Sequence, residues 1–169
     1  KECIETEKDA KSDALIEKFN QLQQEASDND LKILIFTEFR NTQNMLKTVF
    51  ENKGYRCETI NGSQDIDERK RALVAFKNES QILIATDAAG ESLNMQFCHI
   101  IVNYDLPWNP MMIEQRIGRV DRIGQKHKVQ AFNMLTNNSV DLRVYEVIEE
   151  KLNTIIDQLG IDKTSDVLD

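Results

Sequence analysis

The sequence has few of the residues that hold small secreted domains together. Its 169 residues include 3 cysteines, 2 prolines, 6 glycines and 1 tryptophan, and only 7% of them are aromatic. Cys3, Cys57 and Cys98 lie far apart in the chain and form no C-x-x-C pair. This spacing argues against a disulfide scaffold or a zinc site, and it predicts reduced thiols in or near a core.

Long apolar runs are also missing. The longest, such as residues 33–36, 72–76 and 82–85, are far shorter than the roughly 20 residues that a membrane span requires. The chain begins with Lys1 and has no charged-then-apolar signal sequence, so we expect a fragment of a longer cytosolic protein and no membrane partner. Apolar residues still make up 40% of the chain, which is enough for the core of one domain.

The net charge of −8 argues against a simple nucleic-acid-binding protein. The acidic side chains, however, are concentrated at the two ends. Residues 1–30 and residues 138–169 each carry a net charge of −5, whereas residues 31–137 carry +2. The mildly basic centre is compatible with a phosphate-binding face.

Short apolar runs alternate with segments of helical spacing along the chain. This alternation predicts an α/β fold, in which a parallel sheet is flanked by helices on both faces. We expect an N-terminal helical lead-in over 1–30 with Ser12 as a helix cap, an α/β lobe over 31–137, and a brace helix with an acidic tail over 138–169. The expected strands cover residues 31–37, 56–60, 81–85, 98–103 and 129–135, and the expected helices cover residues 12–27, 39–53, 67–77, 111–117 and 139–159.

Three arginines at a spacing of three stand in Q-R-I-G-R-V-D-R-I-G-Q, residues 115–125. Arg116, Arg119 and Arg122 would lie on one side of a helix or an extended turn, and their rigid forks match phosphate oxygens. Gly118 would let a ligand or another backbone come close. The alternative is a solvated basic stripe on a surface helix, but glycine is costly in an ordinary helix.

This segment resembles motif VI of superfamily-2 helicases, and its R-I-G-Q ending is similar to the Swi/Snf-type branch. Four further segments resemble elements of the same group in the same order: residues 33–37 motif IV, 61–69 the G-S…R element, 82–94 motif V and 105–110 the D-x-x-W-N-P segment. The resemblance implies the second, C-terminal RecA-like lobe of a helicase-like ATPase.

Some residues depart from the pattern of chromatin-remodelling members. Asp121 stands where those members usually have His, Asp87 stands where they often have Arg, and Arg116-Ile117-Gly118 replaces A-x-D. The sequence is more similar to bacterial members such as the RNA-polymerase-associated RapA ATPases. We therefore expect a cytoplasmic, nucleoid-associated bacterial protein, with RNA polymerase or another DNA-bound protein as the partner to test.

No G-x-x-x-x-G-K-[ST] loop and no D-E-x-x box occurs in the sequence. The resemblance implies that these elements, which hold ATP and Mg²⁺, sit on a preceding N-terminal RecA-like lobe. It also implies that both lobes together move along double-stranded DNA without separating its strands. This lobe alone should therefore not hydrolyse ATP.

The resemblance assigns roles residue by residue. Arg119 and Arg122 would be arginine fingers on a surface that faces an open cleft, and four residues would contact the nucleotide: Gln115, Asn94, Gly90 and Glu91. Six residues would contact nucleic acid: Thr86, Trp108, Arg40, Gly62, Ser63 and Arg69.

Several of these residues have ordinary structural alternatives. Arg116 could form an ion pair within the domain, and Thr86 could cap the next helix. Trp108 could anchor its own loop, Glu91 could be a first-turn helix acid, and Arg69 could belong to a solvated face. For the whole chain, the alternatives to a DNA motor lobe are a lobe of an RNA or restriction-type helicase and a non-motor α/β module that binds a phosphate ligand.

Overall fold

A five-stranded parallel sheet forms the centre of the molecule. The computed structural model describes residues 2–28, 30–87, 95–135, 143 and 146–147. The strands are β1 (Ile33–Thr37), β2 (Cys57–Ile60), β3 (Ile82–Thr86), β4 (Ile100–Asn103) and β5 (Gln130–Asn133). They lie in the order β2-β3-β1-β4-β5, and every neighbouring pair is parallel. The predicted parallel α/β sheet is confirmed, with its five strands close to the predicted ranges.

The three central strands are buried on both faces. Every residue of β1, β3 and β4 is buried, which explains why these strands are continuously apolar in sequence. Edge strand β5 is largely exposed and correspondingly more polar.

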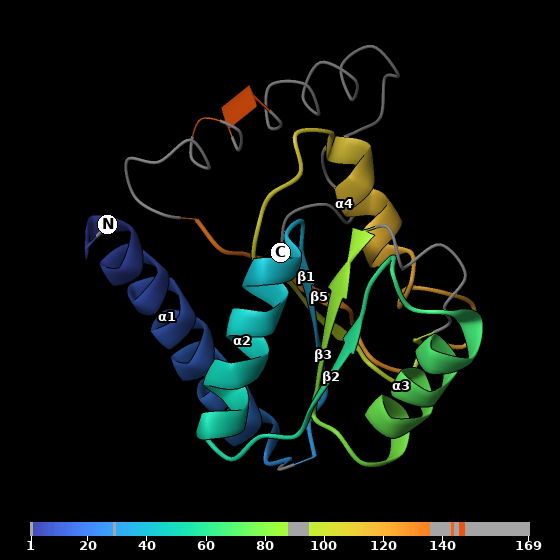
Figure 1. Cartoon of the computed structure of the whole chain (residues 1–169). Helices are drawn as coiled ribbons and strands as arrows, with labels where there is room; N and C mark the ends of the chain where they lie inside the picture. Colours follow the sequence, from blue (N-terminus) through green and yellow to red (C-terminus); the bar gives the residue numbers. More distant parts are fainter. Residues whose placement is uncertain (1, 29, 88–94, 136–142, 144–145, 148–169) are drawn as a thin grey trace.

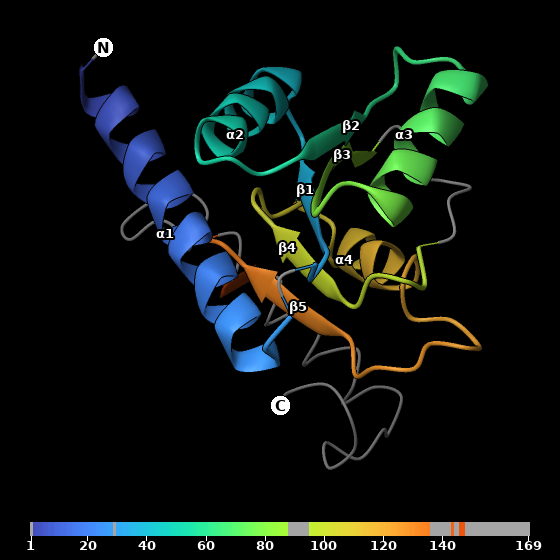
Figure 2. The ribbon, with the colours of Figure 1, turned by 90° about the horizontal axis from the view of Figure 1, so that it is seen from below.

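Helices cover both faces of the sheet (Figures 1 and 2). Helices α1 (Glu2–Ala26) and α2 (Arg40–Asn52) pack on one face, here called the α1/α2 face, and α3 (Ile66–Asn78) and α4 (Pro110–Ile117) pack on the other, the α3/α4 face. Successive strand residues alternate between the two cores: in β1, Ile33 and Ile35 face α1 and α2, while Leu34 and Phe36 face α3 and α4.

Helix α1 differs from its prediction at the N-terminal end. It begins at Glu2, so Ser12 is not a cap but a buried residue inside the helix, 3% exposed. The predicted apolar positions Leu15, Phe19 and Leu22 do enter the core of the α1/α2 face. The predicted helix 139–159 lies almost entirely outside the described residues. Among the helices that the structure describes, none is long and apolar enough to cross a membrane.

Candidate functional site

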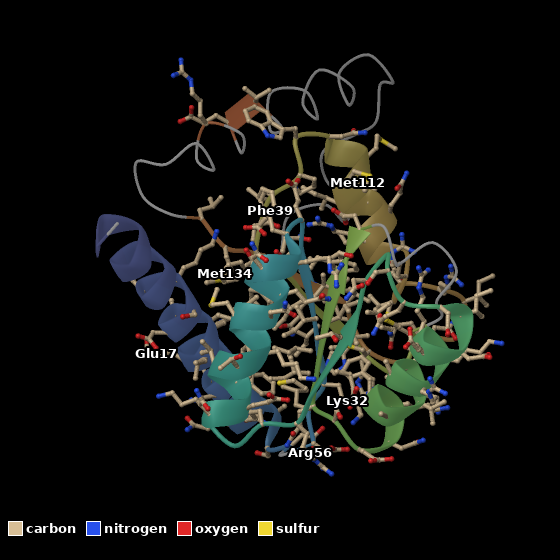
Figure 3. The ribbon with its side chains drawn as sticks, in the orientation of Figure 1. Glu17, Lys32, Phe39, Arg56, Met112 and Met134 are labelled. Atoms are coloured by element: carbon tan, nitrogen blue, oxygen red, sulfur yellow. The ribbon has the colours of Figure 1, made fainter. Side chains whose placement is uncertain are left out.

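Polar side chains gather at the carboxyl ends of the strands. Adjacent strands β1 and β4 continue to opposite faces there, because β1 leads to α2 and β4 leads to α4. Such a switch point is where open parallel sheets bind ligands. Figure 3 shows Phe39 and Met112 at this end of the molecule and Lys32 and Arg56 at the opposite end.

The loops after β1 and β4 are tied together at the switch point. Thr37 donates its hydroxyl to a carboxylate oxygen of Asp105, and the same carboxylate accepts the backbone N–H of Glu38 at 3.2 Å. Thr37 is fully buried. Asp105 therefore fixes the spacing of two loops that lead to helices on different faces of the sheet.

Arg116 is the largest fully buried side chain of the site, 1% exposed. Its Nε and Nη2 donate to the two carboxylate oxygens of Asp87 at 2.8 and 2.7 Å. Its Nη1 donates to Asn103 Oδ1 at 2.8 Å and to the carbonyl of Asp105 at 3.1 Å. Its guanidinium also lies over the ring of Phe36, 5.1 Å from the centroid.

The Arg116 network settles one of the alternatives left open by the sequence. Arg116 forms the ion pair within the domain, through a bidentate pairing with Asp87. Its contacts join the ends of β3 and β4 to helix α4. The sequence singled out Asp87 only as a departure from the family pattern and did not identify Asn103 at all; the short polar residues that end two buried strands were the available signal.

Helix α4 leads into the turn that carries the other two arginines. The helix begins with Asn109 as its cap, whose side chain accepts the N–H of Met111, and with Pro110 in its first turn. It ends at Gly118, where a Cβ would lie 3.3 Å from the carbonyl oxygen of Glu114. The close neighbour of Gly118 is therefore the backbone of its own helix.

Arg119 and Arg122 lie on the turn after α4 in different environments. Arg122 is exposed, and its Nε donates to the carbonyl of Gly118 at 3.1 Å. Arg119 is 8% exposed, so the expectation of a surface residue is wrong for this arginine. The segment folds back into the α3/α4 core at Val120, which is fully buried, and this packing draws its neighbour Arg119 inward.

The predicted nucleotide contacts are only partly within the described residues. Gln115 is exposed on α4. Gly90, Glu91 and Asn94 lie outside the described residues, so their predicted roles remain predictions.

The predicted nucleic-acid contacts follow four neighbouring strands at one edge of the sheet. Trp108 follows β4 and is 62% exposed, and Arg40 is exposed at the start of α2 after β1. Thr86 ends β3 and is 5% exposed. Gly62 and Ser63 lie in the connection between β2 and α3, and Arg69 lies in the first turn of α3.

Arg69, in the first turn of α3, reaches back to the turn that follows β2. Its Nη2 donates to the carbonyl of Gly62 at 3.3 Å, and Ser63 Oγ donates to Asn61 Oδ1 at 2.7 Å. A capping box between Asp65 and Glu68 fixes the first turn of α3. The turn is thus preorganised by its own side chains.

Two of the thiols are buried as expected. Burial raises the pKa of both Cys57 and Cys98 to about 12, and for Cys57 the nearby Glu51 carboxylate adds to the effect. Both are therefore protonated and unreactive at neutral pH. Within the described ranges, no group of three or more His, Cys, Asp or Glu side chains could hold a metal ion.

Comparison with known proteins identifies the family. The family model described as the helicase conserved C-terminal domain matches residues 15–124. The chain belongs to this family. Among solved structures, the C-terminal part of the Fun30 ATPase domain superposes with a TM-score of 0.75 at 23% identity, covering 82% of this chain and 44% of that one. The C-terminal domain of the DEAD-box protein Dbp5 gives 0.68 at 23% identity, covering 85% and 79%. The predicted RecA-like fold of a second helicase lobe is confirmed.

Curated relatives agree with the predicted branch. An ATP-dependent helicase of Bacillus subtilis, YqhH, is 40% identical over 73% of this chain. The RNA polymerase-associated protein RapA of Pseudomonas putida is 38% identical over 61%, and a mouse SWI/SNF-related regulator of chromatin is 32% identical over 81%. The predicted similarity to the Swi/Snf-type branch is confirmed. The chain spans only 22%, 11% and 14% of these three relatives.

Proposed function

We propose that this chain is the C-terminal motor lobe of an ATP-dependent translocase that acts on double-stranded DNA. The observation that carries the proposal is the arginine-bearing turn after α4, which the buried Arg116, paired with the partly buried Asp87, fixes at the carboxyl end of the sheet. An exposed arginine on a preorganised turn suits electrostatic stabilisation of a phosphoryl group that a facing lobe holds.

The donor set fits the phosphate end of ATP. Arg122 and Arg119 would stabilise charge that develops on the transferred γ-phosphoryl group, and Gln115, Gly90, Glu91 and Asn94 would lie toward the nucleotide. ATP, when bound, supplies the phosphoanhydride bond that water cleaves. Mg²⁺ and the phosphate-binding lysine would come from an N-terminal RecA-like lobe of the same protein. Arg122 is the arginine that this lobe already exposes, whereas Arg119 would have to turn outward.

The DNA track would run along the loops that follow the strands. The candidate contacts stand in the order of the sheet, from Gly62 and Ser63 after β2, through Thr86, to Arg40 after β1 and Trp108 after β4. Arg40 and Arg69 would neutralise phosphates, and the exposed ring of Trp108 would pack against the duplex. The similarity to RapA supports RNA polymerase, or another protein bound to DNA, as a partner of the two-lobed protein.

ATP hydrolysis by a protein that carries both lobes tests the proposal. We expect slow turnover alone and strong stimulation by duplex DNA, and no turnover by the 169-residue chain. Stimulation by single-stranded RNA instead of duplex DNA would favour an RNA helicase lobe. Turnover by the isolated chain, or tight phosphate-ligand binding without an activity in the two-lobed protein, would contradict the motor assignment.

A further inference from the structure

The segment that follows Arg119 and Arg122 is attached to a second segment of the chain. The backbone N–H of Met95 donates to the carbonyl of Arg119 at 3.2 Å, and Gln96 Nε2 donates to the carbonyl of Ile123 at 2.7 Å. Two hydrogen bonds thus tie the arginine-bearing turn to residues 95–96.

The side-chain amide of Gln125 adds further hydrogen bonds to this attachment, through both its nitrogen and its oxygen. Its Nε2 lies 3.0 Å from the carbonyl oxygens of Gln96 and Cys98 and 3.1 Å from that of Val120. Its Oε1 accepts the backbone N–H groups of Lys126 and His127 at 2.9 and 3.1 Å. A single half-buried side chain therefore joins the turn to the 95–98 segment and also orders the chain that leaves it.

Residues 121–124 of this turn are exposed. Ile123 is fully exposed, and Gly124 adopts a φ of +104°, a conformation that glycine readily supplies. The backbone N–H of Gln125 donates to the carbonyl of Arg122 at 2.9 Å, which closes the turn directly on the exposed arginine. Arg116 fixes the helix before the turn, and Gln125 fixes the chain after it.

We propose that Gln125 is a positioning residue for ATP hydrolysis, acting by holding the turn that carries Arg122 in the orientation that the reaction requires. The proposal rests on the function proposed above. Gln125 is not itself a catalytic group, because both ends of its amide are used by backbone atoms of this lobe. Its effect reaches the nucleotide only through Arg122.

Gln125→Glu tests these hydrogen bonds alone, because it replaces the amide NH₂ by an oxygen and keeps the length of the side chain. One carboxylate oxygen can still accept the backbone N–H groups of Lys126 and His127. The other oxygen lies against the carbonyl oxygens of Gln96 and Cys98, which lose their hydrogen-bond donor. In the two-lobed protein with saturating duplex DNA, we expect kcat to fall about 10- to 100-fold, as for a misplaced catalytic group. The KM for ATP should change by less than about threefold. Gln125→Met, which loses the hydrogen bonds without adding charge, should act in the same direction.

A stability control separates positioning from general weakening of the fold. Phe50 is fully buried in the opposite, α1/α2 core, so Phe50→Leu should lower the midpoint of thermal unfolding without lowering kcat at 25 °C. Gln125→Glu should lower kcat even when its unfolding midpoint is no lower than that of Phe50→Leu. Equal kcat values for Gln125→Glu and the wild type would overturn the proposal.

A double variant shows whether Gln125 acts through Arg122. In an Arg122→Lys background, Gln125→Glu should lower kcat by less than about threefold further, because residues that act as one unit are not additive. Full additivity would contradict the proposed route. If Arg122→Lys alone leaves kcat unchanged, the proposed arginine-finger function itself is wrong. If Arg122→Lys lowers kcat but Gln125→Glu keeps the wild-type kcat, only the positioning role of Gln125 is wrong.

Discussion

The two faces of the sheet differ in the side chains that they bury. On the α1/α2 face, Phe19, Phe50 and Tyr55 pack edge to face in an apolar core. On the α3/α4 face, the segment 116–120 brings in Arg116 and Arg119, the only charged residues that are buried among those the structure describes. The first face stabilises the lobe mainly by apolar burial, with the buried amide of Gln43 hydrogen-bonded to the carbonyls of Ile60 and Ile84. The second face uses buried charge to hold a turn in place. We infer that the arginine-bearing part of the candidate site lies on the α3/α4 side of the switch point.

The largest expected effect comes from removing an arginine of the turn. Arg122→Ala in the two-lobed protein should lower kcat by about 10³- to 10⁵-fold, because the guanidinium would act on charge that develops in the transition state. Ground-state affinity for ATP should fall much less. The free energy of unfolding should change by less than about 1 kcal/mol, because the side chain is exposed. Steady-state ATPase assays and urea unfolding of the same preparation measure both quantities.

Arg119 allows a second prediction because, unlike Arg122, it is buried. Arg119→Ala should lower kcat as Arg122→Ala does, but it should also lower the free energy of unfolding by about 1–3 kcal/mol. Equal stability of the two variants would mean that the buried position of Arg119 contributes nothing to the fold.

The next largest effect concerns the Arg116–Asp87 pair. Arg116→Met leaves the Asp87 carboxylate without its partner, and it should cost about 3–5 kcal/mol in the free energy of unfolding. Adding Asp87→Leu should recover part of that loss, because no partly buried carboxylate then remains unpaired. Urea unfolding of the single and double variants checks this.

Phe50→Ala is the matched change on the other face. It should cost a similar amount of stability, about 3–5 kcal/mol, yet the folded fraction should keep the wild-type kcat. If Arg116→Met and Phe50→Ala prove equally harmless to kcat per folded molecule, the functional difference between the two faces disappears.

These predictions also show what the sequence could and could not foresee. Strands β1, β3 and β4 were predictable because residues buried on both faces must be apolar throughout. The cap at Ser12 was wrong, because a helix that packs along a core can continue past a good cap residue when tertiary contacts outweigh local preference. Arginine spacing in residues 116–122 indicated a candidate site, but the opposite environments of Arg116 and Arg122 depend on strands distant in sequence.

Duplex DNA binding should respond more modestly. Arg40→Ala and Trp108→Ala in the two-lobed protein should each weaken binding by about 2- to 20-fold. Arg40→Ala should also reduce the salt dependence of the binding constant by about one ion, because one fewer phosphate is neutralised. Fluorescence anisotropy with a labelled duplex at several salt concentrations measures this. Val74→Ala, at an exposed position on α3 away from these loops, is the control and should bind normally.

The smallest expected effect is a pH dependence at His99. Burial, together with the stacked ring of His127 at 4.7 Å, lowers the pKa of His99 below its ordinary value, with Asp28 acting weakly in the opposite direction. The unfolded chain therefore binds this proton more readily than the folded one, so stability should fall as the pH drops from about 7 to 5. His99→Gln should flatten that part of the curve of unfolding free energy against pH. An unchanged curve would mean that His99 takes up its proton equally well in both states.

The kcat of Arg122→Lys, measured in the two-lobed protein with saturating ATP and duplex DNA, tests the central claim most directly. Lysine keeps the positive charge at an exposed position but lacks the planar fork that matches phosphate oxygens. The account predicts a kcat at least about 100-fold below the wild type, with an unchanged midpoint of thermal unfolding. A kcat close to the wild-type value would show that the turn after α4 contributes no arginine to the reaction.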